Sequence, residues 1–339
     1  MRFRGIKGKP TWMGYGVSVA FLHAVGIACL LLAIQKNPAF LGLGFLAYTL
    51  GMRHAFDVDH IAAIDNTVRK LVQQKKNPTG VGFLFSMGHS SVVCIMAFIT
   101  AFAAHWAQLH IPQMKAIGGM IGTYVSGFFL VMIGVVNLYI MLNMIKVFKG
   151  MRSGEYGEHK MDELLHSRGL IARFITPLLR FVNKSWHVYP IGFLFGLGFD
   201  TASEVALLAI SAGAAQSAYS LMGLLALPIL FAAGMSLLDT ADGIFMTTAY
   251  RWALTTPLRK VYYNLTVTGL SVIAALMIGF IELSQVLSEK LGLKGTFWNW
   301  VQELDLGSLG YLLVGLFVLS WACSYAAWRF LRIEENFGS

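Results

Sequence analysis

Two histidines and three aspartates are crowded into one short segment of a largely apolar stretch of the chain. The segment reads RHAFDVDHIAAIDN over residues 53–66, and these ionisable members are His54, Asp57, Asp59, His60 and Asp65. Charge at membrane depth costs several kcal/mol per group, so a chain that keeps such groups generally uses them. Imidazoles and carboxylates without thiolates suit borderline divalent cations such as nickel, cobalt or zinc. The segment therefore predicts a metal site or a proton pathway, with a hydrogen-bonded network between helices as the alternative.

The spacing within this segment leaves one question open. With about 100° between successive residues of a helix, His54, Asp57 and His60 share one stripe. Asp59 points elsewhere, and Arg53 flanks the stripe. A regular helix cannot direct both aspartates at one point, so we expect a broken helix here if both serve the site.

Three further polar clusters occur in other apolar stretches. One is SMGHSS over 86–91, which holds a third histidine, and the others are FDTASE over 199–204 and DTAD over 239–242, each with two carboxylates. Each cluster alone fits a buried hydrogen-bond network or a proton relay. Four clusters on four segments indicate one shared site.

The composition indicates which elements must carry these clusters. Of the 339 residues, 56% are hydrophobic and only 13% are charged, and the mean hydropathy is +0.64. Soluble domains carry about 25% charged residues, so the chain is predicted to be a membrane protein. The net charge of +9 does not indicate nucleic-acid binding, because the basic residues lie mainly between the apolar stretches.

A helix that crosses a membrane needs about 20 apolar residues, and eight stretches qualify. We predict an all-α polytopic membrane protein with a single transmembrane domain and spans near 15–35, 40–65, 82–104, 117–144, 188–211, 220–247, 262–287 and 307–330. The loop at 145–187 is predicted to be cytoplasmic, with an amphipathic helix over 169–182. With the N-terminus inside, 21 of the 26 basic residues fall in cytoplasmic segments and four in external ones. This asymmetry predicts cytoplasmic termini and a multi-pass protein of the cytoplasmic (inner) membrane.

A repeat relates two parts of the chain. Residues 56–62 (FDVDHIA) resemble 199–206 (FDTASEVA), and 85–90 (FSMGHS) resemble 231–236 (FAAGMS). In the predicted topology the second helix runs inward and the fifth outward, so helices 2–3 and 5–6 would form an inverted repeat. Inverted repeats with polar residues at their interface are typical of secondary transporters.

Four motifs together resemble the NiCoT family of nickel/cobalt transporters: RHAFDVDHIAAIDN (53–66), FSMGHSSVV (85–93), LGFDTASE (197–204) and GMSLLDTADG (234–243). The resemblance covers nearly the whole chain and implies eight helices, cytoplasmic termini and high-affinity uptake of Ni²⁺ or Co²⁺. It also implies that His54, Asp59 and His60 belong to the metal site, with His89 close by. Val58 departs slightly from the family's usual first motif and leaves the ligands in place.

The metal ligands predicted from the stripe and the resemblance together are His54, Asp57, Asp59, His60 and His89. The residues predicted to support the site or couple protons are Arg53, Asp65, Asn66, Ser90, Asp200, Thr201, Glu204, Asp239 and Asp242. The choice between Asp57 and Asp59 as the ligand stays open.

We therefore expect a secondary transporter that imports nickel or cobalt through an intramembrane His/Asp site. The membrane potential would drive it, and proton coupling is left open. The sequence has no GxxxxGKS/T nucleotide-binding motif, and the expected partners are the metal ion and the bilayer, without a resident cofactor. An exporter or channel for another divalent cation such as zinc is the main alternative. An intramembrane metal hydrolase is disfavoured, because no glutamate lies beside His54, His60 or His89 to act as its base. The sequence does not rank nickel against cobalt and gives no oligomeric state.

Overall fold

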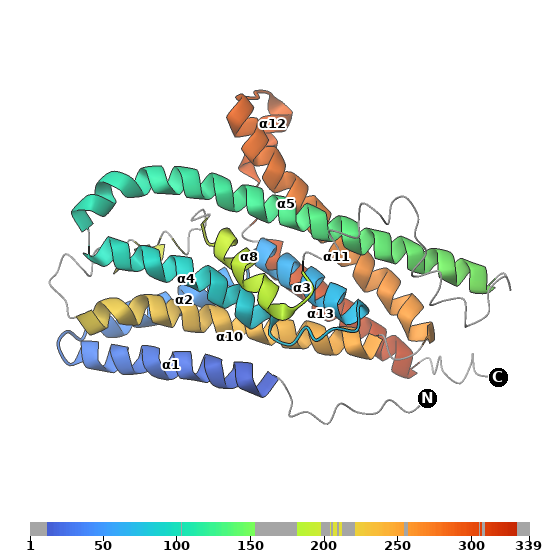
Figure 1. Cartoon of the computed structure of the whole chain (residues 1–339), viewed down its shortest axis with the longest axis horizontal. Helices are drawn as coiled ribbons and strands as arrows, with labels where there is room; N and C mark the ends of the chain where they lie inside the picture. The colour runs from blue at the N-terminus through green and yellow to red at the C-terminus, as the bar shows by residue number, and fades with distance from the viewer. Residues whose placement is uncertain are drawn as a thin grey trace. The chain divides into compact units, whose positions relative to one another are not determined.

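The computed structural model describes residues 12–102, 104–152, 182–197, 204, 206–208, 210–211, 221–253, 257–304, 306 and 309–330. Every element within these residues is helical (Figure 1). Five of the described stretches are long and apolar enough to cross a membrane: Trp12–Ile34, Val81–Ile99, Ile117–Tyr139, Met222–Arg251 and Thr268–Leu291. The predicted class, an all-α polytopic membrane protein, is confirmed. The predicted number of eight spans stays a prediction.

The helices divide into two compact units. The first contains the described residues within Met1–Ala55, Asn77–Gly122 and Lys184–Ile244, and the second those within Phe56–Lys76, Thr123–Asn183 and Phe245–Ser339. Two long helices, α5 (Ala104–Arg152) and α10 (Leu221–Ala253), contribute one part to each unit.

The first unit is built from helices of both halves of the sequence repeat. Besides its parts of α5 and α10, it contains α1 (Trp12–Ile34), α2 (Phe40–His54), α4 (Val81–Phe102), η1 (Ser185–His187) and α8 (Val188–Phe195). One of its buried cores includes Phe40 and Ala47 of α2 together with Leu227 and Phe231 of α10. The unit therefore packs the second predicted helix against the sixth.

Glycines bring α2 and α10 to backbone contact. Gly51 of α2 lies against the Phe231 carbonyl, so close that a Cβ would stand 2.1 Å from the oxygen. In the same way, a Cβ on Gly234 of α10 would stand 2.4 Å from the Tyr48 carbonyl oxygen. Small residues of this kind allow membrane helices to pack closely without a hydrophobic driving force.

The crossing of α4 and α8 repeats this arrangement. A Cβ on Gly192 of α8 would stand 2.1 Å from the Phe85 carbonyl oxygen, and one on Gly88 of α4 would stand 2.0 Å from that of Tyr189. Each Phe-x-x-Gly helix thus packs on the Tyr-x-x-Gly helix of the other half of the repeat. The repeat seen in the sequence includes the Phe-x-x-Gly pair (85–88 and 231–234) but not the Tyr-x-x-Gly pair (48–51 and 189–192).

The contacts also give the relative directions of these helices. The residue numbers of α4 rise as those of α10 fall, in the pairs Gly82 with Asp239, Ser86 with Ser236, and Cys94 with Pro228. The numbers rise together along α2 and α10 (Phe40 with Gly223, Gly51 with Phe231) and along α4 and α8 (Phe85 with Gly192, His89 with Gly196). Since α4 and α10 are antiparallel, α2 and α8 must run in opposite directions. This is the inverted arrangement that the repeat predicts.

The second unit is organised around α3 (Val58–Gln73). Its other elements are its parts of α5 and α10, then α11 (Pro257–Leu291), α12 (Thr296–Glu303) and α13 (Leu309–Phe330). Helix α3 lies against α11 and α13. Gly310 of α13 sits so close to the start of α3 that a Cβ would stand 1.6 Å from the Phe56 carbonyl oxygen. The ring of Phe56 stacks on Tyr311, with 4.8 Å between centroids, so α13 holds the N-terminal turn of α3.

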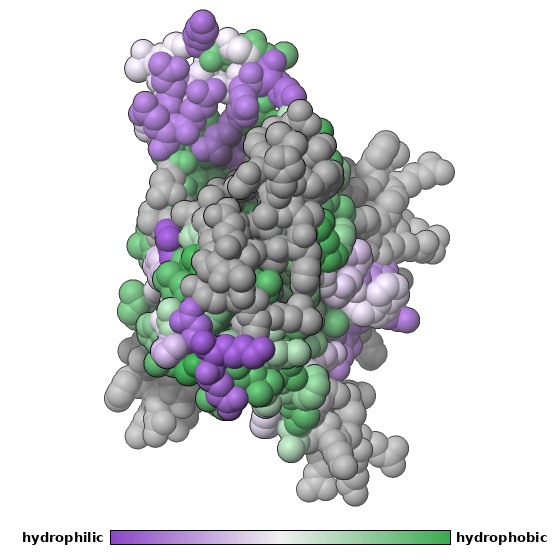
Figure 2. All heavy atoms as spheres, turned by 90° about the vertical axis from the view of Figure 1, so that its left-hand side faces the viewer, coloured by the Kyte–Doolittle hydropathy of each residue, from purple (hydrophilic) through white to green (hydrophobic). Residues whose placement is uncertain are grey.

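The corner formed by α11 and α12 carries a polar surface. Figure 2 shows hydrophilic side chains gathered over it, and its exposed residues include Glu289, Lys290, Lys294, Asn299 and Glu303. Helix α12 also exposes Phe297 and Trp300. Amphipathic aromatic segments of this kind are typical of a membrane–water interface. The sequence did not predict α12, because a helix of only eight residues carries little periodic signal.

Three predicted spans have different bounds in the structure. The span predicted at 40–65 is two helices, because Asp57 has an extended conformation as the N-cap of α3. The span predicted at 188–211 is interrupted after Phe195. The span predicted at 117–144 is part of α5, which extends beyond it at both ends. Nearly all of the amphipathic segment predicted at 169–182 lies outside the described residues.

Candidate metal site

The break between α2 and α3 distributes the first motif over two helices. Helix α2 ends at His54, a two-residue turn follows, and Asp57 has φ −64° and ψ 138° before α3 begins. An aspartate at this N-cap position favours a helix start, because its negative charge lies at the positive end of the helix dipole. The stripe of His54, Asp57 and His60 on one regular helix was therefore wrong, and the broken helix proposed in its place is present.

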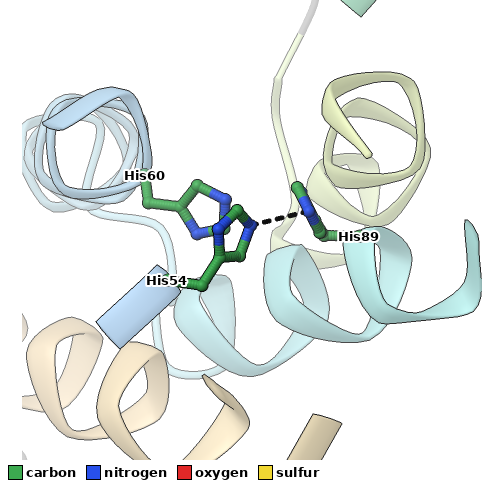
Figure 3. A group of neighbouring side chains, drawn as sticks. All are labelled: His54, His60 and His89. Carbon is green, nitrogen blue, oxygen red and sulfur yellow. Dashed lines mark hydrogen bonds between the residues drawn. The ribbon is translucent and has the colours of Figure 1, made fainter. Parts of the chain in front are cut away.

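Three buried side chains of the first unit bring ligand atoms together. His54 Nε2 lies 2.8 Å from His89 Nε2, a contact drawn in Figure 3, and His89 Nε2 lies 2.8 Å from Glu204 Oε1. His54 Nε2 and Glu204 Oε1 are 3.9 Å apart. Each of the three residues is at most 3% exposed. The first and second halves of the repeat therefore both contribute to one cluster.

The glycine contacts explain how this cluster forms. His54 is the last residue of α2, and its ring lies 5.7 Å from that of Phe231, next to the Gly51 crossing. On the other side, a Cβ on Gly196 would stand 2.9 Å from the His89 carbonyl oxygen, so the chain leaving α8 passes directly over the turn that carries His89. Glu204 has helical backbone geometry, and its carboxylate reaches His89.

The hydrogen-bonding capacity of His89 does not match its surroundings. Its Nε2 atom carries either one hydrogen or one lone pair, yet it has two neighbours at 2.8 Å. A hydrogen would serve an ionised Glu204 but not His54, whereas a lone pair would accept from His54 and repel the carboxylate. A cation among the three atoms resolves this conflict, because two imidazole nitrogens and one carboxylate oxygen can all direct lone pairs at it.

The three distances also suit a cation in detail. Sides of 2.8, 2.8 and 3.9 Å make a nearly right-angled triangle with its corner at His89 Nε2. The midpoint of the longest side therefore lies about 2.0 Å from all three atoms, the usual length of a bond from a transition metal to nitrogen or oxygen. An ion there would see His89 Nε2 at about 90° to each of the other two atoms, and those two would lie opposite each other at about 180°, as in square-planar or octahedral coordination rather than tetrahedral.

The other predicted ligands belong to the second unit. His60 is 1% exposed and Asp57 is 9% exposed, and both lie at the start of α3. Asp59 is partly exposed, and its carboxylate accepts the His60 backbone N–H at 2.9 Å. His60 is the third histidine drawn in Figure 3.

The predicted supporting residues occupy different surroundings. Glu204 lies within the cluster, with its Oε1 atom 2.8 Å from His89 Nε2. Asp65 and Asn66 lie in a fully buried polar network of the second unit. Of the rest, Ser90 and Asp239 are buried, Asp242 is partly exposed and Arg53 is exposed, while Asp200 and Thr201 lie outside the described residues.

Sequence reasoning missed three members of that network: Arg69, Asn137 and Tyr250. The predicted spans leave Arg69 and Lys70 in the cytoplasmic segment at 66–81, but in the structure they lie in α3 and are 1% and 0% exposed. The available signal was the four-residue spacing of Asp65 and Arg69, which on a helix brings opposite charges together.

A polytopic α-helical membrane protein with a buried site of imidazoles and a carboxylate has the architecture of a transporter for divalent cations. Comparison with known families agrees. The model of the NicO family, described as high-affinity nickel-transport protein, matches residues 40–327, and the chain belongs to this family.

Individual relatives are similar over almost their whole length. The chain is 56% identical over 332 residues to the high-affinity nickel-transport protein NixA of Helicobacter pylori, covering 96% of this chain and 99% of that protein. It is 54% identical over 328 residues to the nickel transporter NixA of Staphylococcus aureus, covering 97% of each. It is 38% identical to the cobalt transport protein NhlF of Rhodococcus rhodochrous, over 90% of this chain and 88% of that protein. No solved structure matches the chain significantly.

Family membership confirms the resemblance to nickel/cobalt transporters and the expectation of a transport protein rather than an enzyme. It implies a divalent metal ion as cargo and a membrane as the environment.

Proposed function

We propose that the protein imports Ni²⁺ or Co²⁺ across the cytoplasmic membrane through a site that contains His54, His89 and Glu204. We include His60 and one carboxylate of Asp57 or Asp59 as further ligands, because the first motif places them directly after His54 in the chain. The ion is cargo, and the transporter needs no resident cofactor.

The observation that carries this proposal is the right-angled convergence of His54 Nε2, His89 Nε2 and Glu204 Oε1. Nitrogen and oxygen ligands in square-planar or octahedral positions suit Ni²⁺, and octahedral positions also suit Co²⁺. Zinc prefers a tetrahedral set, which has neither right angles nor directly opposite ligands. The geometry thus favours nickel or cobalt over zinc, the main alternative cargo.

The membrane potential is sufficient to drive import. One charge moving through about 100 mV is worth about 2.3 kcal/mol, so inward movement of a divalent ion along an inside-negative potential releases about 4.6 kcal/mol. At about 1.4 kcal/mol per tenfold, this energy supports a concentration ratio of about 2,000. Import therefore requires no nucleotide hydrolysis, and proton coupling would be an addition.

The proposed orientation has both termini in the cytoplasm. Removing the buried Arg69 and Lys70 from the count of basic residues leaves 19 on the cytoplasmic side against four outside. The asymmetry that favours this orientation therefore persists.

The test is uptake of radioactive Ni²⁺ and Co²⁺ by liposomes that contain the purified protein, under an imposed inside-negative potential. We expect accumulation that depends on the potential, and loss of accumulation in His54→Ala and His89→Ala proteins that insert normally. Partly exposed His187, which lies outside the four motifs, offers a histidine control, and His187→Ala should transport normally.

Competition identifies the cargo in the same assay. Excess unlabelled Ni²⁺ or Co²⁺ should suppress uptake more strongly than Zn²⁺ does. Stronger suppression by Zn²⁺, or accumulation only under an inside-positive potential, would contradict the proposal and favour the zinc or export alternatives.

A further inference from the structure

The second unit contains a buried ion pair that the transport site does not use. Arg69 Nη2 lies 2.6 Å from Asp65 Oδ2, one helical turn away on α3, and the two residues are 1% and 0% exposed. Burying two charges costs free energy unless further hydrogen bonds complete their solvation. The surroundings of this pair supply such bonds to both carboxylate oxygens and to two of the three guanidinium nitrogens.

Two neighbouring helices complete the pair. The Tyr250 hydroxyl of α10 donates to Asp65 Oδ1 and accepts from Arg69 Nη2 at 2.7 Å. Arg69 Nη1 donates to the Thr268 carbonyl oxygen of α11 at 3.0 Å, and the guanidinium carbon stands 5.0 Å from the centroid of the Tyr250 ring. Both carboxylate oxygens and both terminal nitrogens of the guanidinium therefore have partners.

A neutral contact next to the ion pair ties α3 to a third helix. Asn137 Nδ2 of α5 donates to Asn66 Oδ1 at 2.8 Å, and Asn66 Nδ2 donates to the Ala62 carbonyl oxygen at 2.8 Å. Asn66 and Asn137 are both fully buried. Within little more than one turn, α3 is thus joined by polar contacts to α5, α10 and α11.

These contacts fix how far along its axis α3 can lie. The ion pair and Asn66 hold the middle of the helix, while Gly310 and Tyr311 of α13 hold its first turn. That first turn carries Asp59 and His60, and Asp57 caps it. A shift of α3 along its axis would break every one of these contacts together, so the contacts set the position of the residues at its start.

The same contacts argue against a proton-carrying role for Asp65. Protonation of this carboxylate would leave Arg69 as a buried charge without its counterion and would take the charged acceptor from Tyr250. Loss of one partner of a buried pair is far more costly than replacement of both. Asp65 is therefore suited to a fixed negative charge.

We propose that Asp65, Arg69 and Tyr250 are positioning residues, which hold α3 so that its N-terminal turn presents His60 and its neighbouring carboxylates to the cargo, and that Asp65 carries no proton during transport. This rests on the proposed function, because the effect is measured through affinity for Ni²⁺.

The variants are chosen to distinguish a loss of helix positioning from the effect of an unpaired charge and from misfolding. Asp65→Asn combined with Arg69→Gln keeps hydrogen-bonding groups in place and leaves no unpaired charge. Tyr250→Phe keeps both charges and removes only the bridging hydroxyl. Tyr124→Phe is the matched control, since Tyr124 is 43% exposed on α5 of the same unit.

Ni²⁺ uptake by proteoliposomes is measured as the half-saturating concentration and the maximal rate per inserted molecule. We expect the half-saturating concentration to rise roughly threefold in Tyr250→Phe and about tenfold in the double variant, with maximal rates near wild type. Tyr124→Phe should match wild type in both.

Two results would overturn the proposal. A properly inserted double variant without any uptake would indicate that Asp65 carries a proton, and unchanged half-saturating concentrations in Tyr250→Phe would show that the network positions nothing. If the double variant does not insert, Tyr250→Phe decides alone. A wild-type protein that fails to accumulate Ni²⁺ refutes the proposed function instead, and is recognised before any variant is compared.

Discussion

Replacing Glu204 by glutamine tests the metal site most directly. Glutamine has nearly the same shape and keeps one oxygen within reach of His89, but it removes the negative charge from the three-atom cluster. Mutations of groups that merely orient metal ligands reduce affinity about 10–100-fold. Because Glu204 would contact the ion itself, we expect the upper end of that range. A roughly 100-fold rise in the half-saturating Ni²⁺ concentration corresponds to about 2.7 kcal/mol.

The assay is the initial rate of Ni²⁺ uptake into proteoliposomes as a function of Ni²⁺ concentration, corrected for inserted protein. Glu282→Gln is a matched control, since Glu282 is also buried, at 7% exposure, but lies on α11 in the second unit. The control should stay within about twofold of wild type, as expected for a site outside the cluster. A Glu204→Gln variant that inserts normally and keeps wild-type affinity would refute the reasoning, because the carboxylate would then not be a ligand.

Two further predictions concern acid and helix packing. Protons compete with metal for imidazole nitrogens, so uptake at subsaturating Ni²⁺ should fall as the external pH is lowered from about 7.5 to about 5 and recover at saturating Ni²⁺; a rate that stays flat would argue against histidine ligation. Gly51→Ala places a Cβ 2.1 Å from the Phe231 carbonyl oxygen, so it should destabilise the detergent-solubilised protein by about 1–3 kcal/mol and impair uptake by displacing His54, as measured by thermal unfolding and transport. Gly42→Ala on the same helix meets no atom within 4 Å and should be neutral or slightly stabilising, and equal effects of the two variants would contradict the close-packing explanation.

Hydropathy located most of the described helices because lipid exposure and burial select the same side chains. Phe21 and Phe45 are 67% and 69% exposed, yet they raise the hydropathy of α1 and α2 as much as the buried Phe40 does. The same property hides interruptions. Asp57 caps a new helix within a stretch that remains apolar on average, so hydropathy does not reveal the break between α2 and α3. The break could be predicted only from the directions in which the candidate ligands must point.

The sequence predicts imidazoles and carboxylates at the candidate site, and the structure brings His54, His89 and Glu204 together. His54 and His89 could be predicted as ligands because histidine at membrane depth is unusual. Glu204 could be placed only in the same region, since its approach to His89 depends on how closely Gly88 and Gly192 let α4 and α8 pack. Such long-range contact leaves no periodic pattern in the sequence. Tyr250 is separated from Asp65 by 185 residues, and for the same reason it was not found.

The crossed packing of the repeat also bears on how the protein is made. Gly51 of α2 is synthesised long before Phe231, whose backbone it contacts, and Gly88 of α4 likewise precedes Tyr189. Until the second half of the chain enters the bilayer, the helices of the first half lack the surfaces that fit them. During biogenesis the helices of the first half must therefore remain in the membrane without their packing partners, and the bundle can fold fully only after the helices of the second half are inserted. The cluster of His54, His89 and Glu204 is completed in that same late step, since the first half of the chain supplies the two histidines and the second half supplies the glutamate.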